Sequence, residues 1–398
     1  MNDESYDFMR ILSIDEARCF STKNKTVIVT GVTGQDGSFM VDYLLKNTNY
    51  EIFGGARRLS VSNHDNIKHL EKEKRFHLIN FDLTDAHSIS QTISVLKPNY
   101  FINLAAQSFV KSSWDFPSQT WETNTTGVLH ILEAIRLHCP TCRFYNAGSS
   151  EEFGDVAYSP QDEKHPSRPR SPYGASKSAA RQLVKVYRES YDMYAVQGWL
   201  FNHEGTRRGE EFVTRKITKN VSRIFNELRT GETPSPLELG NIDSVRDWSD
   251  AEDMVDAIWR MLNQDTYRHD IESLVKDFDK TSHIMLPRNI NPSWHSLLVK
   301  NLKEYVVGSG VTHTIREFVS EAFNCVNISG NWIKGQSPLD EIFINDNIVL
   351  VKINKAYYRT AEVEYLHANP NLIKNELGWQ PQTTFQGLVN KMIFTDLK

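Results

Sequence analysis

The chain contains few cysteines, and their scarcity argues against a fold held together by disulfides. Four cysteines occur in 398 residues, at Cys19, Cys139, Cys142 and Cys325, and they are too few and too scattered to form a framework of bridges. Cys139 and Cys142 form a C-x-x-C pair, but no second Cys or His pair stands near it, so we expect no metal site. This usage is typical of a reducing compartment and predicts a cytoplasmic protein.

The chain also lacks a long apolar run and an excess of positive charge. No stretch of about 18 apolar residues occurs, so we expect no membrane span, and the first residues lack the basic flank and apolar stretch of a secretion signal. The 45 Lys and Arg residues are outnumbered by 50 Asp and Glu, which gives a net charge of −5. A nucleic acid is therefore not an expected partner. We interpret residues 1–22 as an N-terminal extension.

From Lys25 onward, β-branched segments alternate with amphipathic ones. The pattern predicts strands at 26–30, 51–55, 77–81, 100–104, 143–147 and 195–200, and helices at 38–46, 89–96, 121–138 and 175–191. Such alternation predicts an α/β fold with a Rossmann-type doubly wound parallel sheet over residues 23–200.

Beyond residue 200 the alternation loosens, which predicts that residues 201–398 form a smaller, discontinuous C-terminal domain for the substrate. Within it, we expect residues 239–262 to pack back on the Rossmann domain. Residues 264–302 are polar and contain two prolines, so they are predicted to be an insertion on the surface.

A glycine-rich turn follows the first predicted strand and precedes the first predicted helix. It has the form G-x-x-G-x-x-G over residues 31–37. Glycines permit a tight turn, and the helix that follows offers free backbone N–H groups to a pyrophosphate. The context therefore predicts dinucleotide binding by Gly31, Thr33, Gly34, Gln35, Asp36 and Gly37.

Two arginines, Arg57 and Arg58, follow the second strand, where an NAD-binding protein would place an acidic residue on the ribose. Guanidinium groups bind phosphate well, so the pair favours NADP over NAD. The alternative is a pair of solvated arginines with no ligand.

Further cofactor contacts are expected where the third and fourth strands end. The carboxyl ends of parallel strands are where ligands of such sheets bind. The residues at these ends are Asp82, Leu83, Leu104, Ala105, Ala106 and Ser108. The alanines could instead serve only close packing.

A tyrosine and a lysine, Tyr173 and Lys177, stand four residues apart at the start of a predicted helix, and this spacing places both on one face. A nearby ammonium favours phenolate, so we expect Lys177 to lower the pKa of Tyr173 and let it act as a base. Ser149, at the end of another strand, can hydrogen-bond the same substrate oxygen. The three residues predict hydride chemistry at an alcohol carbon.

Several longer stretches carry a resemblance to a known family. They are TGVTGQDGS (30–38), SPYGASK (171–177), FNHEGTRRGEEFVTRKIT (201–218), LGNIDSVRDW (239–248) and THTIREF (312–318). They resemble the extended short-chain dehydrogenase/reductases that act on nucleotide sugars, and among these the GDP-mannose 4,6-dehydratases. The resemblance extends from Lys25 to Leu397 apart from the insertion.

This resemblance implies a lyase that converts GDP-mannose to GDP-4-keto-6-deoxy-mannose. Hydride passes from C4 of the sugar to NADP and returns at C6, while a carboxylate, here Glu151, removes the C5 proton and helps to expel the C6 hydroxyl as water. We expect Glu151 and Ser149 to face the same side of an extended segment. The resemblance also implies that Asn202 and Lys216 bind the diphosphate.

The remaining positions implied by the resemblance concern the nucleotide, the cofactor and assembly. Arg246, Arg359 and Glu362 are expected to contact the nucleotide, and His203 and Arg208 the cofactor. The loop 57–63 resembles one that reaches a neighbouring subunit, which implies a homodimer or homotetramer.

The sequence departs from the family at a few positions, and other functions stay open. The usual Ser-Thr-Ser-Glu-Leu-Tyr-Gly is here Gly148-Ser-Ser-Glu-Glu-Phe-Gly154, which adds an acid at Glu152. The usual Ser-Pro is replaced at 205–206, and Val311 replaces a typical glutamate. An epimerase or reductase would use Tyr173 and Lys177 without needing Glu151. A dehydratase for another nucleotide-hexose and an NADP-binding regulatory protein with an idle site are further alternatives.

Overall fold

The computed structural model describes residues 10–20, 24–58, 63–271, 292–358, 363 and 365–398. These residues form a central eight-stranded sheet with the strand order β1-β4-β3-β2-β5-β6-β7-β11, and neighbouring strands are all parallel. The strands are Ile11–Leu12 (β1), Thr26–Thr30 (β2), Glu51–Ala56 (β3), Phe76–Asn80 (β4), Tyr100–Asn103 (β5), Arg143–Ala147 (β6), Ala195–Leu200 (β7) and Val306–Val307 (β11). The predicted Rossmann-type parallel sheet is confirmed.

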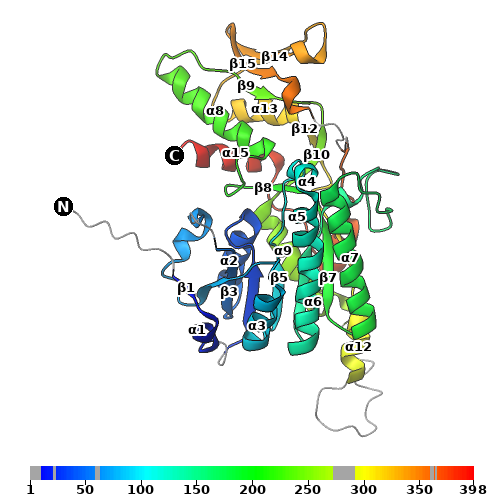
Figure 1. Ribbon diagram of the computed structural model, residues 1–398. Helices are drawn as coiled ribbons and strands as arrows, with labels where there is room; N and C mark the ends of the chain where they lie inside the picture. The colour runs from blue at the N-terminus through cyan, green and yellow to red at the C-terminus, as the bar shows by residue number, and fades with distance from the viewer. Residues whose placement is uncertain (1–9, 21–23, 59–62, 272–291, 359–362, 364) are drawn as a thin grey trace, which may run out of the picture.

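Helices cover both faces of this sheet (Figure 1). One face packs against α2 (Gln35–Asn47) and α9 (Ala251–Leu262), and the other packs against α3 (Ala86–Leu96), α6 (Gly127–His138) and α7 (Pro172–Tyr191). Because both faces are covered, the strands carry near-continuous apolar runs, and all five residues of β2 are buried. In the described ranges, no helix is both long enough and apolar enough to cross a bilayer.

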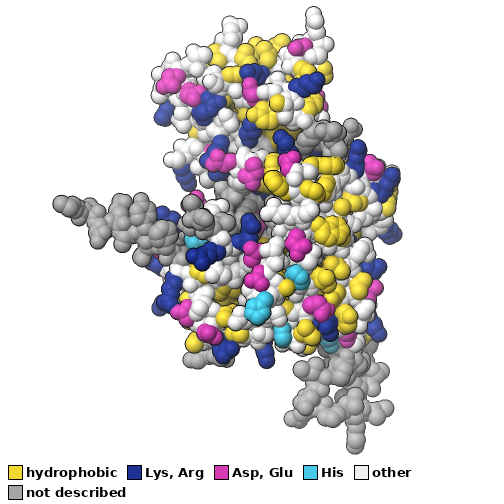
Figure 2. Space-filling model, viewed as in Figure 1, with side chains coloured by type: hydrophobic (Ala, Val, Ile, Leu, Met, Phe, Trp, Pro, Cys, Tyr) yellow, Lys and Arg dark blue, Asp and Glu magenta, His cyan; other side chains and the backbone are white. Residues whose placement is uncertain are grey.

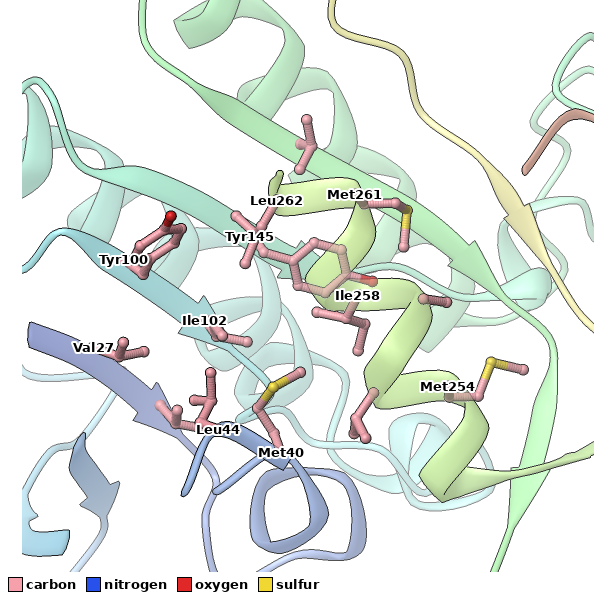
Figure 3. Packing of buried hydrophobic residues seen from close by; sticks show 14 of the residues in the cluster. Val27, Met40, Leu44, Tyr100, Ile102, Tyr145, Met254, Ile258, Met261 and Leu262 are labelled. Atoms are coloured by element: carbon pink, nitrogen blue, oxygen red, sulfur yellow. The ribbon is translucent and has the colours of Figure 1, made fainter. Parts of the chain in front are cut away.

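The packing of α9 shows how the core is filled (Figure 3). Tyr145 and Ile102 of the sheet face Ile258 and Met261 of α9, and Met40 of α2 completes the layer. All five side chains are fully buried. Helix α9 belongs to the later half of the chain, yet it covers the sheet built by the first half.

The remaining elements form a second, smaller part above the main sheet (Figure 1). It contains a three-stranded sheet of β8, β10 and β12, and a four-stranded sheet in the order β13-β14-β15-β9. Three helices share one apolar cluster with the four-stranded sheet. The bounds are Asn202–Glu204 (β8), Leu237–Leu239 (β9), Val245–Asp250 (β10), Thr312–Thr314 (β12), Asn331–Ile333 (β13), Ile342–Asn345 (β14), Ile348–Ile353 (β15), Val213–Arg229 (α8), Ile315–Asn324 (α13) and Phe385–Asp396 (α15).

Short helical segments connect these elements. They are Ile14–Arg18 (α1), Asp65–Leu70 (η1), Ser112–Asp115 (α4), Pro117–Trp121 (α5), Glu122–Thr126 (η2, a π-helix), Ser150–Glu152 (η3), Gln264–Tyr267 (α10), Pro292–Lys300 (α12), Pro338–Asp340 (η4), Lys355–Tyr357 (η5) and Asn371–Leu377 (α14).

The chain crosses between the two parts several times. Strand β8 follows directly after β7, and β10 leads without a gap into α9. Strand β11 then returns to the main sheet and pairs with β7, with Val306 opposite Trp199. The second part is therefore assembled from segments that are separated in the sequence.

The segment interpreted as an N-terminal extension contributes to the sheet. Ile11 and Leu12 pair with Leu78 and Ile79 and so extend the sheet past β4. Ser13 then caps α1 through a capping box with Glu16. A two-residue strand is too short to give a periodic pattern, which is why the sequence did not reveal it. Residues 1–9 and 21–23 lie outside the described residues.

The described residues at the two ends of the segment 264–302, which the sequence predicts to be an insertion, include buried side chains. Ile271, Leu298, Val299 and Leu302 belong to the main apolar core, and Arg268 is 2% exposed with its guanidinium bound by surrounding oxygens. A segment rich in polar residues has the composition of a surface loop, and the sequence does not show that some of these residues are buried with hydrogen-bond partners. Residues 272–291 lie outside the described residues.

We expect Ile258→Ala to lower the free energy of unfolding by about 2–5 kcal/mol, because it opens a cavity between α9 and the sheet. Urea denaturation followed by circular dichroism measures this change. Val311→Ala is the control, since Val311 is 56% exposed, and it should shift the stability by less than about 0.5 kcal/mol. Equal stability of the two variants would contradict the packing described for α9.

Candidate active site

A cavity of about 730 Å³ lies between the carboxyl edge of the main sheet and the second part of the chain. It is lined by loops that follow β5, β6 and β7 and by residues of α8 and β10. Many of the residues predicted from the sequence line it together. They are Asp36, Leu104, Ala106, Ser108, Ser149, Glu151, Tyr173, Lys177, Asn202, His203, Arg208, Lys216 and Arg246.

The glycine-rich turn lies at the edge of this cavity, between β2 and α2. Gly31 has a φ of +72°, and a Cβ there would lie 2.8 Å from the backbone nitrogen of Ala105. A Cβ on Gly37 would lie 2.2 Å from the carbonyl oxygen of Gly31. Side chains are therefore excluded at both positions. With Gly34 as the N-cap of α2, the turn presents backbone N–H groups as a pyrophosphate requires, so the residues present fit a dinucleotide.

An ion pair joins this turn to the second part of the chain. The carboxylate of Asp36 lies 2.9 Å from Nε2 of His203, whose Nδ1 lies 2.7 Å from the carbonyl oxygen of Phe201. Burial alone would raise the pKa of Asp36, but the charge and hydrogen bond of His203 outweigh it and lower this pKa to about 2. For His203, burial is again opposed by its partner, and the carboxylate raises the histidine pKa. Each member of the pair therefore favours the charged form of the other.

Other predicted cofactor residues do not line this cavity. Arg57 and Arg58 are exposed just after β3, and the Asp82 carboxylate accepts hydrogen bonds from the backbone N–H and hydroxyl of Thr84 at 2.9 and 2.8 Å. Leu83 is 3% exposed and packs in the core beneath α6. Thr33, Gln35 and Ala105 lie in the turn or beside it without lining the cavity.

The predicted reactive side chains come from two neighbouring elements. Ser149 is the N-cap of η3, just past the end of β6, and Tyr173 lies in the first turn of α7. The Ser149 hydroxyl lies close enough to the Tyr173 phenol to lower its pKa. Nζ of Lys177 donates to the carbonyl oxygen of Ala147 at 2.9 Å and lies 5.8 Å from the ring centroid of Tyr173. The serine, tyrosine and lysine are thus within one site.

Burial, rather than the charge of Lys177, has the largest effect on the pKa of Tyr173. It raises the pKa of Tyr173, and the hydrogen bond from Ser149 opposes this only in part. Burial also lowers the pKa of Lys177 to about 8, although the carboxylates of Glu152 and Asp36 act in the other direction. The predicted net lowering of the Tyr173 pKa is therefore wrong for this structure, because burial of the phenol outweighs the effect of the charges around it.

Glu151 reaches the cavity by a different local geometry from the one predicted. Residues 150–152 form a turn of 3-10 helix instead of an extended segment, and the backbone N–H of Glu151 donates to Oγ of Ser149 at 3.2 Å. Both side chains nevertheless line the cavity. A Cβ on Gly174 would lie 2.6 Å from the carbonyl oxygen of Glu151. That glycine lets α7 approach the turn that carries the acid.

A row of buried side-chain hydrogen bonds crosses the sheet beneath these residues. Thr30 donates to Asn103 at 2.6 Å, Asn103 donates to Asn146 at 2.8 Å, and Asn146 donates to Gln197 at 2.6 Å. The Gln197 amide continues the row to the Glu152 carboxylate at 3.1 Å. One connected set of bonds therefore links the strand before the glycine turn to the turn that carries Ser149.

The family follows from matches over most of the chain. A model of the family described as GDP-mannose 4,6 dehydratase matches residues 28–294 and 286–392. The chain belongs to the GDP-mannose 4,6-dehydratase family. A GDP-mannose 4,6 dehydratase of Drosophila melanogaster is 39% identical over 391 residues, covering 95% of this chain and 87% of the relative. One from Caenorhabditis elegans is 37% identical over 404 residues, covering 99% and 94%.

Solved structures show the same fold at lower identity. A UDP-glucose 4-epimerase of Thermus thermophilus superposes with a TM-score of 0.67 and 22% identity, covering 93% of this chain and 98% of its own. A dTDP-glucose 4,6-dehydratase of Bacillus anthracis gives 0.66 and 18%, covering 93% and 96%. The architecture of this GDP-mannose 4,6-dehydratase family member is thus shared with enzymes of other names.

The far side of the cavity contains three of the residues that resemblance to the GDP-mannose 4,6-dehydratases implied for the substrate. Asn202, Lys216 and Arg246 line it. Nζ of Lys216 donates to the carbonyl oxygen of Glu238 at 2.7 Å and lies 3.6 Å from the ring centroid of Tyr357. Burial lowers the pKa of Lys216. Arg359 and Glu362 lie outside the described residues.

Sequence reasoning missed the aromatic part of the cavity wall. Phe109, Trp114, Phe212 and Tyr357 line it, and the guanidinium carbon of Arg208 lies 3.5 Å from the ring centroid of Phe212. Phe212 stands within the matched stretch 201–218, so its position was available as a signal. Trp114 follows no motif, and only the fold brings it to the cavity.

We expect the Lys177 amine to lose its proton near pH 8 in the folded protein, because burial lowers its pKa from 10.5 to about 8. Only the neutral amine reacts with acylating reagents. Labelling at limiting reagent, read by mass spectrometry on the Lys177 peptide, should therefore rise with a midpoint near pH 8. The same lysine in urea-unfolded protein is the control and should label with a midpoint near pH 10.4. Coincident midpoints would contradict the described burial.

Proposed function

We propose that this protein catalyses the 4,6-dehydration of GDP-mannose to GDP-4-keto-6-deoxy-mannose, with NADP as a cofactor that is regenerated in each cycle. The observation that carries the proposal is the grouping of Ser149, Glu151, Tyr173 and Lys177 at one end of the cavity. Ser149, Tyr173 and Lys177 match a site for hydride transfer at an alcohol carbon, and the Glu151 carboxylate adds the base that an elimination requires. Membership of the GDP-mannose 4,6-dehydratase family supports this reaction and this substrate.

The tyrosine and serine act on the C4 oxygen of the sugar. The Tyr173 oxygen accepts the C4 hydroxyl proton when hydride leaves the carbon, and the Ser149 hydroxyl hydrogen-bonds the same oxygen. When bound, NADP would supply the acceptor, and later the donor, of the hydride. Lys177 holds its charge close to the phenol and, in the protonated form, favours phenolate. A C4 ketone makes the neighbouring C5 proton acidic.

Glu151 then performs the step that separates a dehydratase from a simple oxidoreductase. Its carboxylate takes the C5 proton, and the C6 hydroxyl leaves as water, for which the protonated acid is the nearby proton donor. The hydrogen bond from the Glu151 backbone to Ser149, at 3.2 Å, keeps the acid beside the C4 site. Both reactive centres can therefore be served without moving the sugar.

Charged and amide groups around the cavity support the choice of ligands. Asn202 and Lys216 suit a diphosphate, and Arg246 suits the nucleotide. Arg57 and Arg58, exposed after β3, suit the 2′-phosphate of NADP. The turn 31–37, with Asp36 paired to His203, suits the pyrophosphate. With a net charge of −5 and few cysteines, we infer a cytosolic enzyme for a small substrate rather than for nucleic acid.

We expect the purified protein, given GDP-mannose and a trace of NADP, to form a product lighter by one water without net consumption of cofactor. Mass spectrometry measures the product, and absorbance at 340 nm measures the cofactor. An unchanged mass with inverted stereochemistry would instead identify an epimerase. Loss of water only from another nucleotide-sugar would keep the mechanism and replace the substrate.

We expect Glu151→Gln to lower turnover by about 100-fold or more, because an amide cannot remove the C5 proton, whereas NADP binding should be unchanged. Turnover and cofactor affinity, by fluorescence titration, separate the two effects. Glu189→Gln is the control, since Glu189 is exposed on the outer side of α7. Wild-type turnover in Glu151→Gln would remove the acid from the mechanism.

The outer surface of α6 and α7 supports the inference that the protein is a homodimer or homotetramer. Hydrophobic side chains gather there (Figure 2). Leu137 is 61% exposed, Val186 and Tyr191 are each 50% exposed, and nearby Trp121 is 47% exposed. Patches of this kind mark protein contacts. The family resemblance implies that the loop 57–63 reaches a neighbouring subunit. Residues 59–62 of this loop lie outside the described residues.

We expect light scattering at micromolar concentration to give a mass of at least twice 45.8 kDa. Leu137→Glu together with Val186→Glu should shift the mass toward the monomer, because charges buried in an interface are costly. Val311→Glu places the same charge on a different exposed surface and serves as the control. A monomeric wild-type protein would overturn the assembly.

A further inference from the structure

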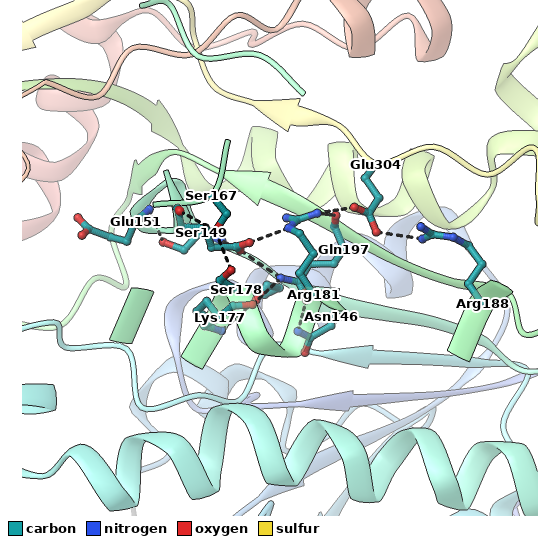
Figure 4. A network of polar contacts seen from close by, with 12 residues as sticks. Asn146, Ser149, Glu151, Ser167, Lys177, Ser178, Arg181, Arg188, Gln197 and Glu304 are labelled. Carbon is teal, nitrogen blue, oxygen red and sulfur yellow. Dashed lines mark hydrogen bonds and ion pairs between the residues drawn. The ribbon is translucent and has the colours of Figure 1, made fainter. Parts of the chain in front are cut away.

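A cluster of polar side chains lies next to the active-site residues, and Figure 4 shows Arg181, Gln197 and Glu304 of this cluster near Ser149. The carboxylate of Glu152 is bound by Arg181, by Gln197 and by the backbone of Ser149. Glu152 is fully buried. Its Oε1 accepts from the backbone N–H of Ser149 at 2.9 Å and from Nε2 of Gln197 at 3.1 Å, and its Oε2 accepts from Nε of Arg181 at 2.6 Å. One carboxylate thus joins the turn after β6, the strand β7 and the helix α7.

The cluster is balanced in charge. Arg181 donates to Glu304 at 2.5 Å and to the carbonyl oxygen of Gln197 at 3.0 Å, and its guanidinium carbon lies 3.5 Å from the ring centroid of Trp199. Glu304 also accepts from Arg188 at 2.9 Å. Two carboxylates therefore alternate with two guanidinium groups, which is the arrangement that buried charges require.

The cluster contacts the reactive residues from below. The bond to the Ser149 backbone completes a capping box, in which the Ser149 side chain also receives a backbone N–H of the same turn. The Gln197 amide donates both to Glu152 and to the carbonyl oxygen of Lys177, the latter at 3.2 Å. Arg181 follows Lys177 by one helical turn. Moving the Glu152 carboxylate would therefore disturb both the serine and the lysine.

The charge of Glu152 also acts on Lys177 and Tyr173 through space, without a direct contact. The titratable groups that face Lys177 are Tyr173, Glu152 and Asp36, and the two carboxylates oppose the loss of its proton. Glu152 faces Arg181, Lys177, Tyr173 and Tyr145. Glu304, the other acid of the cluster, is not among the groups that shift the pKa of Lys177.

We infer that Glu152, bound by Arg181, is a positioning residue for the active site: it fixes the turn that carries Ser149 and places a carboxylate beside Lys177. The inference rests on the proposed function for its catalytic consequence, although the placement of the side chains stands by itself.

The first test measures the protonation of the Lys177 amine and does not depend on catalytic turnover. In purified Glu152→Gln, the pH midpoint of Lys177 acylation should fall by about one unit, since a nearby opposite charge is lost. Glu304→Gln is the matched control, because it removes the same charge from the same arginine without a contact to Ser149 or Gln197. It should move the midpoint by much less.

The second test uses a conservative variant and the pH profile of turnover. Glu152→Gln should lower kcat by about tenfold through loss of alignment, with the alkaline limb displaced to lower pH. Glu152→Asp keeps the charge and shortens the side chain, so the labelling midpoint should stay close to the wild-type value while kcat falls. Thermal unfolding of each variant confirms that it is folded.

The two results that would overturn the inference are distinct from failure of the proposed function. A wild-type labelling midpoint in folded Glu152→Gln, or an equal shift in Glu304→Gln, would show that Glu152 has no special role. If the wild-type protein does not dehydrate GDP-mannose, the labelling comparison still decides the placement of the charge. If Glu152→Gln does not fold, Glu152→Asp decides: a labelling midpoint near the wild-type value together with a lowered kcat supports the inference, and a displaced midpoint with unchanged kcat contradicts it.

Discussion

The site depends on polar groups that are buried within the sheet and still satisfied. Asn103, Asn146 and Gln197 stand on adjacent strands at the carboxyl edge, where water is excluded and an unpaired amide would be costly. Each amide orients the next, so none can rotate alone. The loops above these strands are anchored to a rigid row and not only to their own backbone. A parallel sheet with apolar faces thereby acquires a polar edge of fixed geometry.

The electrostatics of the site follow from the same exclusion of water. Desolvation favours the neutral forms of both Tyr173 and Lys177, whereas carboxylates nearby favour the charged lysine and disfavour phenolate. No single pair therefore sets the protonation state. The state is a balance between burial and several fixed charges, and a charged ligand that enters the cavity acts on that balance. This explains how a phenol with a raised pKa can still belong to a site for proton transfer.

The sequence predicted the main sheet because its signals are local. Five-residue apolar runs, the glycine turn and the spacing of Tyr173 and Lys177 each reflect interactions within a few residues. The grouping of Ser149, Glu151, Tyr173 and Lys177 came from the same local signals together with family resemblance. The two-residue strands β1 and β11 could not be found, since pairing partners far along the chain decide them.

Burial of polar residues was the second source of error. Arg268 and Gln264 lie in a segment that was predicted to be on the surface, yet both form hydrogen bonds with residues more than 30 positions away in the chain. The same reasoning applies to Glu152, which a sequence shows only as an extra acid. Its three partners lie 3, 29 and 45 residues away, so its role exists only after folding. The prediction of a lowered pKa for Tyr173 was wrong for the same reason, because the burial of a side chain cannot be read from a sequence pattern.

The repeated crossings between the two parts have a consequence for how substrate enters. A pair of domains joined by one linker can open like a hinge, but here β7 continues into β8, β10 continues into α9, and β11 pairs with β7. Rigid rotation of one part would have to bend the chain at each of these crossings at once. The two parts that enclose the cavity are thus tied together at several points, so substrate does not enter by a hinge opening about a single linker.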